Sequence, residues 1–339
     1  MQKTSLCGLS PVEILDLAGP DDYSIHQAVA VAGCVYRKKL NNIMLFGGIS
    51  GKLKNILNNA SVSGLFRPVK QEVSDDASVK YLFMNNDGQK YETVYLPDKR
   101  RHTVCVSSQS GCRMGCPYCV TGRYGFHGDL TAGEIINQVL SLPFVSGINH
   151  VVFMGMGEPL DNLSNVLKAC SIMTAEWGLA LSPRNVTVST VGITPGVIKF
   201  LNESDCNLAL SLYSPFPEER IMMVPAERKY PSEEIINIMK DFPLKNKRRL
   251  SIAYMMMAGI NDTDSHLEGL KSLFSGSKIR INLLPYHSAR GDTGNITSGP
   301  ERMQHFRHEL VMSGISASIR KSRGEDISAA CGLLASGLE

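Results

Sequence analysis

The stretch Cys112-Arg-Met-Gly-Cys116-Pro-Tyr-Cys119 places three cysteines within eight residues, at C-x3-C-x2-C spacing. It follows Val104–Ser107, a run that predicts a buried strand. Three thiolates on one short loop can each bind one iron of a cubane [4Fe–4S] cluster, and the fourth iron then has no protein ligand. An open metal position is typical of a reactive site rather than a structural one. Cys112, Cys116 and Cys119 are therefore the candidate metal ligands.

Two other interpretations of these cysteines remain open. A zinc ion would need a fourth ligand nearby, and His127, eight residues after Cys119, is the nearest candidate. The three residues could also be ordinary core thiols, since free cysteine is often buried. The density of cysteines in so short a stretch favours the cluster.

The composition of the whole chain excludes several classes of protein. With 339 residues, 43% apolar and 20% charged, the chain can bury a large core, so global disorder is excluded. Nine cysteines are an odd number and do not form a disulfide framework. The formal charge of +3 permits a nucleic-acid partner without indicating one. No apolar run approaches the ~20 residues of a membrane span, and the first residues lack signal-peptide features, so we expect a cytoplasmic protein.

From about residue 100 onward, strand-like runs alternate with helical patterns. The strand-like runs are Val104–Ser107, His150–Met154, Asn185–Ser189, Asn207–Leu212, Leu250–Met256 and Lys278–Leu284, with Ser316–Lys321 as a candidate last strand. The helical patterns are Thr131–Leu142, Asn162–Glu176, Gly196–Leu201, Ser232–Phe242, Asp264–Phe274 and Pro300–Met312. This alternation predicts a parallel α/β core, and six units predict a partial (β/α)6 barrel rather than a doubly wound sheet. Functional sites in such cores gather at the carboxyl ends of the strands.

The residues before this core have a different pattern. Residues 1–75 contain short apolar stretches with loose helical periodicity, which predicts a small helical accessory domain. Val79–Met84 and Tyr91–Leu96 alternate apolar with polar residues around Asn-Asn-Asp-Gly (85–88), a turn signal that predicts a β-hairpin. We therefore divide the chain into an accessory domain (1–75), a hairpin extension (76–100) and the barrel core (101–339).

The cysteine spacing at the head of a six-unit β/α core resembles the radical S-adenosylmethionine (SAM) superfamily. In that superfamily the amino and carboxylate groups of SAM chelate the open iron, and reductive cleavage yields a 5′-deoxyadenosyl radical. Gly155-Met-Gly157-Glu158-Pro159, after an apolar strand, resembles a SAM-binding segment of the superfamily. The resemblance implies a [4Fe–4S] cluster and SAM as cofactors. The SAM contacts it implies are Gly157, Glu158, Pro159, Ser189, Ser211 and His287.

Several segments together are similar to the RlmN/Cfr family of radical SAM RNA methyltransferases. They are Cys105-Val-Ser-Ser-Gln-Ser-Gly-Cys112, Val120-Thr-Gly-Arg-Tyr-Gly-Phe126, Phe153-Met-Gly-Met-Gly-Glu-Pro159 and Asp326–Gly332. The resemblance covers roughly residues 79–335 and is faint over residues 1–75. It implies methylation of an adenine carbon in the ribosomal peptidyl-transferase centre, so the expected partner is large-subunit ribosomal RNA, with transfer RNA as a further candidate.

The family resemblance also implies a mechanism with two cysteines, at the positions of Cys331 and Cys105. Because an adenine ring carbon is not nucleophilic, the thiolate of Cys331 first accepts a methyl group from one SAM. The radical from a second SAM activates this methyl group for addition to the ring. Cys105 then forms a transient disulfide with Cys331 and releases the product. Glu92 matches a family glutamate proposed to help with proton transfer.

The remaining cysteines match no motif, and we interpret Cys7, Cys34, Cys170 and Cys206 as core or incidental thiols. Basic residues near the expected mouth of the barrel are candidate RNA contacts, because neutralised phosphates supply much of the affinity for nucleic acid. These residues are Lys99, Arg100, Arg101, His102, Arg123, Lys245, Lys247, Arg248, Arg249, Arg320, Lys321 and Arg323.

Some positions depart from the family pattern. Tyr213 stands where the family usually has histidine, and His287 stands where it has an asparagine that contacts SAM. Pro225-Ala-Glu227 replaces Pro-Ile-Asn, and residues 23–27 lack the family's positive charge. The motifs are divided between the C2- and C8-methylating branches, and the Gly157-Glu-Pro159 segment favours C2.

The sequence therefore predicts a radical SAM enzyme that methylates an adenine carbon of RNA. We expect a monomer that receives electrons from a low-potential donor such as flavodoxin or ferredoxin. Two alternatives stay open: a diverged radical SAM enzyme with another substrate, and a non-catalytic iron–sulfur or zinc RNA-binding protein. The pair Cys105 and Cys331 discriminates against the first alternative, because a different reaction would not need both thiols.

Overall fold

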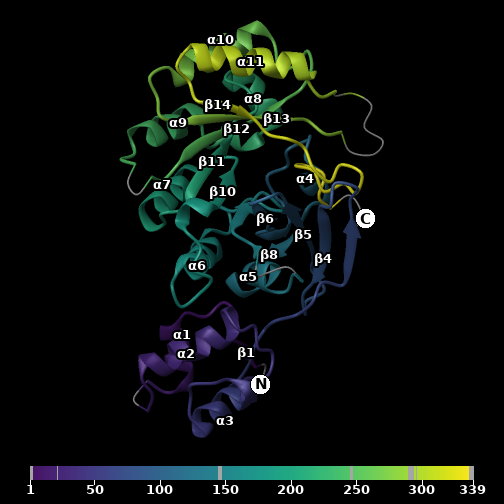
Figure 1. Ribbon diagram of the computed structural model, residues 1–339. Helices are drawn as coiled ribbons and strands as arrows, with labels where there is room; N and C mark the ends of the chain where they lie inside the picture. The colour runs from purple at the N-terminus through teal and green to yellow at the C-terminus, as the bar shows by residue number, and fades with distance from the viewer. Residues whose placement is uncertain are drawn as a thin grey trace.

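The computed structural model describes residues 3–20, 22–143, 147–244, 247–288, 294 and 296–335. Within these residues one ten-stranded sheet forms the centre of the molecule, in the order β14-β13-β12-β11-β10-β9-β6-β5-β4-β3 (Figure 1). Its parallel strands are β6 (His102–Cys105), β9 (His150–Phe153), β10 (Val186–Thr190), β11 (Asn207–Ser211), β12 (Leu250–Met256), β13 (Arg280–Pro285) and β14 (Ala317–Ile319). The predicted partial barrel with a parallel α/β core is confirmed.

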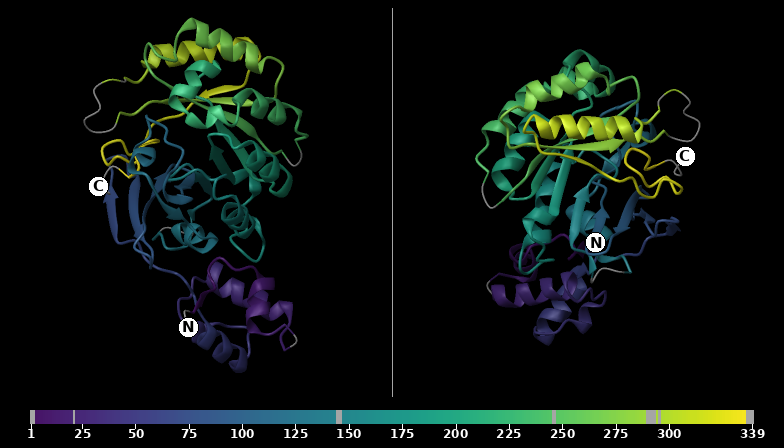
Figure 2. Two further views of the ribbon diagram at one scale, coloured as in Figure 1. Left: turned by 180° about the vertical axis from the view of Figure 1, so that it is seen from behind. Right: turned by 45° about the horizontal axis from the view of Figure 1, so that its top comes forward.

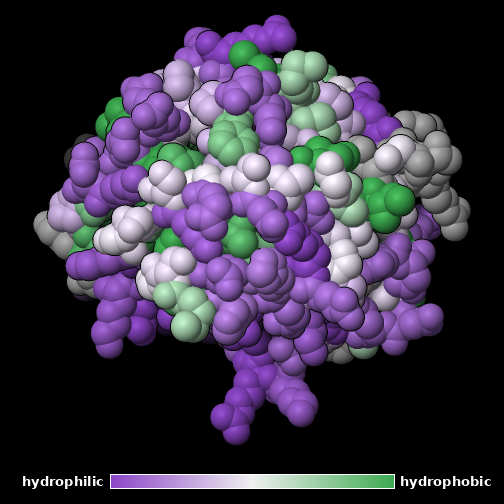
Figure 3. All heavy atoms as spheres, turned by 90° about the horizontal axis from the view of Figure 1, so that it is seen from above, coloured by the Kyte–Doolittle hydropathy of each residue, from purple (hydrophilic) through white to green (hydrophobic). Residues whose placement is uncertain are grey.

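Helices connect the parallel strands and bury one apolar face each. They are α5 (Ala132–Leu140), α6 (Leu163–Thr174), α7 (Thr194–Glu203), α9 (Ser232–Asp241), α10 (Asp264–Phe274) and α11 (Pro300–Met312). α5 begins at a capping box in which the Thr131 hydroxyl and the Glu134 carboxylate each accept the other residue's backbone N–H. Figure 2 shows the sheet curving, with α10 and α11 over its β12–β14 end. Seen from that side in Figure 3, the surface is mostly hydrophilic with scattered apolar residues.

The hairpin extends this same sheet. β4 (Val79–Met84) and β5 (Lys90–Pro97) pair antiparallel, and the turn between them contains Gly88 at φ +77°. β5 then pairs antiparallel with β6, and β3 (Lys70–Val73) pairs with β4 at the outer edge. The first strand of the core therefore has the hairpin on one side and the parallel strands on the other.

The N-terminal residues form a helical cluster at one end of the molecule (Figure 1). It contains α1 (Pro11–Ala18), α2 (Ile25–Tyr36), α3 (Gly51–Ala60) and the short paired strands β1 (Thr4–Ser5) and β2 (Ser61–Val62). Lys168 on α6 contacts Glu13 on α1 at 2.6 Å, and the Asn137 side chain bonds both backbone groups of Phe66. The division of the chain at residues 75 and 100 stays a prediction.

Short elements surround the cysteine-rich loop. β7 (Gln109–Gly111) and β8 (Phe126–Asp129) form a two-stranded antiparallel sheet, and α4 (Val120–Tyr124) lies between them in the chain. α8 (Pro217–Met223) follows β11. As expected, Cys7, Cys34, Cys170 and Cys206 are buried in the hydrophobic core. Among the described residues, no helix combines the length and the apolar character that a membrane crossing requires.

Candidate active site

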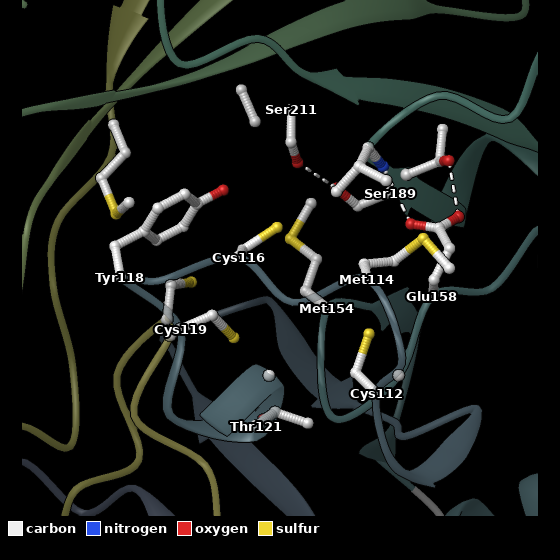
Figure 4. Close-up of a pocket in the computed structure, with 18 of the residues that line it drawn as sticks. Cys112, Met114, Cys116, Tyr118, Cys119, Thr121, Met154, Glu158, Ser189 and Ser211 are labelled. Atoms are coloured by element: carbon white, nitrogen blue, oxygen red, sulfur yellow. Dashed lines mark hydrogen bonds between the residues drawn. The ribbon is translucent and has the colours of Figure 1, made fainter. Parts of the chain in front are cut away.

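The three clustered cysteines line one cavity at the carboxyl ends of the parallel strands. The β7–β8 ladder holds the start of the loop, where the Cys112 N–H donates to the Gly125 carbonyl at 2.8 Å. The Cys119 N–H donates to the Cys116 carbonyl at 3.1 Å, which closes a tight turn before α4. Figure 4 shows Cys112, Cys116 and Cys119 among the side chains that line this cavity, with Cys116 beside Met154. The loop thus places all three cysteines in the wall of one cavity.

A polar network supports this loop from behind. The Arg113 guanidinium contacts Asp161 at 2.7 Å and lies over the Phe126 ring at 3.8 Å. The Gln109 amide donates to Asp129 and to Asp161, each at 2.8 Å. Sequence reasoning missed this network, because nothing in the pattern links Gln109 on β7 to Asp161 after β9.

The Gly155–Pro159 segment follows β9 and borders the same cavity through Gly155, Gly157 and Glu158. Gly157 has φ +96°, and a Cβ there would meet the Gln109 side chain at 2.6 Å, so glycine is required. The Glu158 carboxylate is buried and accepts bonds from Thr190 Oγ1 at 2.6 Å and from the Val191 N–H at 2.9 Å. Burial raises the pKa of Glu158 to about 7. Its side chain therefore ties the end of β9 to the end of β10.

Ser189 and Ser211 lie side by side on β10 and β11, with their hydroxyl oxygens 3.4 Å apart, and both face the cavity (Figure 4). The strand ends behind them are held by Arg220, a fully buried residue of α8. Its guanidinium donates to the carbonyls of Val191 at 2.6 Å and Ser211 at 3.0 Å, and it is paired with the buried Glu227. Glu227 is the residue at which the sequence departs from Pro-Ile-Asn, and here it is the counter-ion of Arg220.

Tyr213 occupies the position of the family's histidine and lines the cavity. Its backbone has φ +67°, a rare conformation for a non-glycine residue, and its carbonyl accepts the Asn261 amide at 2.8 Å. The Tyr213 ring stacks on Tyr118 with centroids 5.9 Å apart. Tyr118 in turn hydrogen-bonds to the Cys116 thiol. The tyrosine is therefore part of the wall next to the cysteine loop.

Cys331 connects this cavity with a second one. It lines the first cavity together with the cysteine loop, and it lines the second together with Cys105. The other residues of the second cavity include His287, Arg320, Lys321, Ser322 and Arg323. The structure thus brings Cys105 and Cys331, which are 226 positions apart in the sequence, into one cavity.

Both thiols have raised pKa values. Burial, followed by the proximity of Cys331, raises the pKa of Cys105 well above its usual range. Cys331 is an exposed residue, yet enclosure of its thiol by neighbouring atoms and then the nearby Cys119 raise its pKa as well. Each thiol must therefore lose a proton before it can act as a nucleophile.

Glu92 lies on β5 but is absent from the residues that line either cavity in the described part of the chain. Its buried carboxylate contacts Lys80 at 3.3 Å and accepts the Ala335 N–H at 2.8 Å. Ala335 is four residues after Cys331, so Glu92 anchors the segment that carries this cysteine. A role of Glu92 in proton transfer stays a prediction.

His287 lines the second cavity rather than the first. Its Nε2 lies 2.7 Å from Ser322 Oγ, and its Nδ1 lies 3.7 Å from Glu325. A contact of His287 with SAM stays a prediction, since the residues described around the cysteine loop do not include it.

The candidate RNA-binding residues have different surroundings. Arg248 is buried, where it donates to the Leu201 carbonyl at 2.8 Å and packs beside Phe200. It therefore stabilises the interior of the protein. Arg323 pairs with Asp76 at 3.3 Å. Arg320 is exposed and lines the second cavity. Lys245 lies outside the described residues.

The comparisons with known proteins agree with this geometry. The radical SAM superfamily matches residues 106–274. A protein of Parabacteroides distasonis named "Probable dual-specificity RNA methyltransferase RlmN" is 40% identical, over 98% of this chain and 97% of that protein. One of the same name from Thermus thermophilus is 43% identical, over 80% of this chain and 78% of its own. The crystal structure of a radical SAM methyltransferase from Sphaerobacter thermophilus has a TM-score of 0.90 at 32% identity, with 98% and 99% of the two chains covered.

The chain belongs to the RlmN family of radical SAM methyltransferases. It is therefore an enzyme, and its cofactors are a [4Fe–4S] cluster and SAM. The donor set fits the cluster, because three thiols line one cavity and the strand-end serines face it from the other side. The alternative zinc ligand, His127, lies on β8 with an exposed side chain against the Tyr124 ring. Because the chain belongs to a family of enzymes, the alternative of a non-catalytic iron–sulfur or zinc RNA-binding protein is excluded.

Proposed function

We propose that this enzyme methylates C2 of an adenine in large-subunit ribosomal RNA, with transfer RNA as a second substrate. Cys331 carries the methyl group, and Cys105 resolves the covalent adduct. Cys112, Cys116 and Cys119 hold the cluster, and Gly157, Glu158, Ser189 and Ser211 form the SAM side of the cavity. The names of the relatives support RNA as the substrate and a dual specificity.

The observation that carries the proposal is the place of Cys331 between the two cavities. A group bound to its sulfur can face the cysteine loop for one step and Cys105 for the next. The second cavity is also cationic, with Arg320, Lys321 and Arg323 in its wall, which suits a nucleotide and its phosphates. A small-molecule methyltransferase would have no use for both features.

When bound, the cluster and SAM would supply the methyl group and, after reduction, a 5′-deoxyadenosyl radical. The thiolate of Cys331 would accept the methyl group. Once this methyl group has given one hydrogen atom to the 5′-deoxyadenosyl radical, its carbon would bond to the adenine ring. To become aromatic again, the ring would give up one electron, for which a bound cluster could serve as acceptor, and one proton to a base. Attack by the Cys105 thiolate on the Cys331 sulfur breaks the sulfur–carbon bond, the methylene carbon takes up a proton, and the two cysteines are left as a disulfide.

The partners of the reaction follow from this chemistry. The reduction requires a low-potential electron donor such as flavodoxin or ferredoxin, and the two cysteines require a thiol reductant after each turnover. An RNA substrate and reducible thiols both suit the cytoplasm. We propose a monomer, because each step uses residues of one chain.

Mass spectrometry of adenosines from ribosomal and transfer RNA tests the proposal, with cells that contain or lack the gene. We expect 2-methyladenosine in both RNA classes only when the gene is present. Restoration by the wild-type gene and not by its Cys331→Ala variant assigns the signal to this thiol. Appearance of 8-methyladenosine instead would overturn the C2 assignment, and unchanged adenosines in both RNA classes would overturn the RNA substrate.

A further inference from the structure

The turn between β3 and β4 binds the chain segment that leads to Cys331. In this turn the Asp76 carboxylate accepts the Gly324 N–H at 3.0 Å and lies 3.3 Å from Arg323 Nε. The Asp76 carbonyl accepts a further bond from Arg323 Nη2 at 2.7 Å, and the same guanidinium bonds the Pro97 carbonyl at the end of β5. Arg323 and Asp76 are 247 positions apart in the sequence. The C-terminal segment is therefore attached to one end of the hairpin (Figure 1).

A second carboxylate makes this attachment reciprocal. Asp326 accepts the Ser74 hydroxyl at 2.6 Å and the Asp75 N–H at 3.1 Å. Each of the two segments thus supplies one aspartate that binds a backbone N–H of the other segment. We call residues 74–76 together with residues 323–326 the clasp.

Both carboxylates of the clasp are ionised at neutral pH. Desolvation of Asp76 is outweighed by hydrogen bonds from Ser78 and Gly324, which hold its pKa well below the usual range. A hydrogen bond from the Ser74 hydroxyl lowers the pKa of Asp326. Hydrogen bonds to an ionised acceptor are stronger than those between neutral groups, so the clasp holds the segment although both aspartates are exposed.

The chain between the clasp and Cys331 is short and compact. Gly324 has φ +66°, and its carbonyl accepts the Ala329 N–H at 2.7 Å, which closes a turn. A Cβ at Gly324 would meet the Ala329 Cβ at 2.8 Å. Ala329 and Ala330 are buried and line the second cavity directly before Cys331. Because the turn is closed and its end is packed, a displacement at the clasp displaces the thiol as well.

After Cys331 the segment is held by other partners. The Val120 N–H donates to the Gly332 carbonyl at 2.9 Å, and the Thr121 hydroxyl donates to the Leu334 carbonyl at 2.9 Å. Both donors belong to α4, the helix that directly follows the cysteine loop. These bonds do not involve the clasp, so the end of the chain stays attached to the core when the clasp is removed.

We propose that the clasp positions the Cys331 sulfur for methyl transfer, with Asp76 and Asp326 as positioning residues. This inference rests on the proposed function and deepens it, since it assigns a role to the turn between β3 and β4. Neither carboxylate touches a reacting atom. Both act by fixing the segment, because the sulfur must approach the methyl carbon in line, and a misplacement of about 1 Å costs on the order of 10²-fold in rate.

The step that depends on this position is a simple displacement. The Cys331 thiol loses its proton to solvent, and its sulfur then forms a bond to the methyl carbon. The carbon–sulfur bond of SAM breaks, and its electron pair stays on the departing S-adenosylhomocysteine. No oxidant or reductant is consumed.

The test compares Asp76→Ala with Asp75→Ala in holoenzyme reconstituted from cluster-free protein. The two residues are neighbours in one exposed turn and carry the same charge, but Asp75 enters the clasp only through its backbone N–H. With SAM that carries a deuterated methyl group, peptide mass spectrometry measures the rate of Cys331 methylation. We expect Asp76→Ala to be slower by about tenfold or more, and Asp75→Ala to match the wild-type enzyme.

Three further measurements separate positioning from a general loss of structure. Asp326→Ala should slow methylation by the same factor, and the double variant Asp76→Ala/Asp326→Ala should be no slower, because the two residues act as one unit. Formation of 5′-deoxyadenosine after reduction should stay at the wild-type rate, since it does not require Cys331. Amide hydrogen exchange should accelerate in residues 323–330 and stay unchanged in the parallel strands.

Three results would overturn the inference. The first is a methylation rate in Asp76→Ala that differs from that of Asp75→Ala by less than about threefold, as for an ordinary surface substitution. The second is slow methylation with an equal loss of 5′-deoxyadenosine, or with faster exchange throughout the sheet, because Asp76 would then support the whole fold. The third is a wild-type enzyme whose Cys331 acquires no methyl group, which contradicts the proposed function itself and is recognised without any variant.

Discussion

A single thiol, Cys331, lies where the cysteine loop and Cys105 come within reach of one another. If Cys105 resolves the adduct, its loss should stop the reaction after the RNA has bonded to the protein. We predict that Cys105→Ala accumulates an RNA–protein species whose crosslink maps to Cys331. Denaturing electrophoresis followed by peptide mass spectrometry measures it.

Two further variants test whether this RNA–protein species is the covalent adduct at Cys331. Cys331→Ala should form no crosslink, and the double variant Cys105→Ala/Cys331→Ala should behave in the same way. A crosslink that persists without Cys331, or turnover by Cys105→Ala at the wild-type rate, would contradict the two-thiol mechanism.

His150, at the start of β9, gives the protein a pH-dependent stability. Burial, followed by the charge of Arg101, lowers its pKa from 6.5 to about 4. Between these pH values the unfolded chain binds the extra proton, so the free energy of unfolding falls as the pH drops from 6.5 toward 4. We predict that His150→Gln reduces the difference between the unfolding free energies at pH 7 and pH 5, measured by urea denaturation.

The exposed His305 is the matched control for this experiment. His305→Gln should leave the wild-type pH dependence unchanged. An identical pH dependence in His150→Gln and the wild-type protein would show that His150 is protonated to the same extent in the folded and unfolded states.

Residue identity predicted the site better than residue charge did. The spacing of Cys112, Cys116 and Cys119 predicted one cysteine loop, and the family resemblance singled out Cys105 and Cys331, because covalent and metal chemistry requires particular residue types. In the structure these residues line two adjoining cavities. The sequence does not show which residue a charged side chain will contact in the folded protein. In the structure Glu92 is buried and anchors the segment that carries Cys331, and Arg248 lies in the core, although both were candidates for functional contacts.

At the scale of elements, α8 holds the cofactor side of the cavity through one buried ion pair. Arg220 bonds the carbonyls of Val191 and Ser211 at the ends of β10 and β11, and Glu227 neutralises it. Removing one partner of a buried pair leaves an uncompensated charge. We predict that Glu227→Ala lowers the free energy of unfolding by about 3–5 kcal/mol, measured by urea denaturation.

The same variant should weaken SAM binding, because Ser189 and Ser211 lie on the strands that Arg220 holds. Glu234→Ala, an exposed change on α9, is the control and should alter stability by less than about 0.5 kcal/mol. A loss of stability in Glu227→Ala no larger than this control would contradict a structural role for the pair.

The long elements were predictable and the short ones were not. The expected strand Leu250–Met256 and helix Asp264–Phe274 have the bounds found in β12 and α10, because strong periodicity extends over their whole length. β7, β8 and α4 span three to five residues each, too few to show a period. These short elements shape the cysteine loop. The cysteine motif could therefore be recognised in the sequence, whereas the strands and the helix that hold it could not be predicted.

At the scale of the whole molecule, curvature of the sheet gathers basic residues from distant parts of the chain. Arg101 precedes β6, Arg249 precedes β12 and Arg280 begins β13, while Arg320 follows β14. Although Arg320 is exposed, partial desolvation by neighbouring atoms first, and then the charges of Arg101, Arg280 and Arg249, lower its pKa, which means that these charges lie near one another. Like charges that repel one another are stabilised by a polyanion, and RNA is the polyanion of the proposed reaction.

The net charge of +3 does not reveal this local concentration of positive charge. The experiment must therefore compare two variants that lose the same number of positive charges. We predict that replacing Arg101, Arg249 and Arg280 with alanine weakens RNA binding and reduces the slope of log affinity against log salt by about one per arginine that contacts a phosphate. The comparison variant replaces the exposed Lys199, Lys240 and Arg307 of α7, α9 and α11 with alanine, which removes the same charge from the outer helices. Because phosphate contacts are local while net charge acts at long range, the two variants should differ in slope. Equal slopes in both would mean that RNA is attracted by overall charge and that the arginines contact no phosphate.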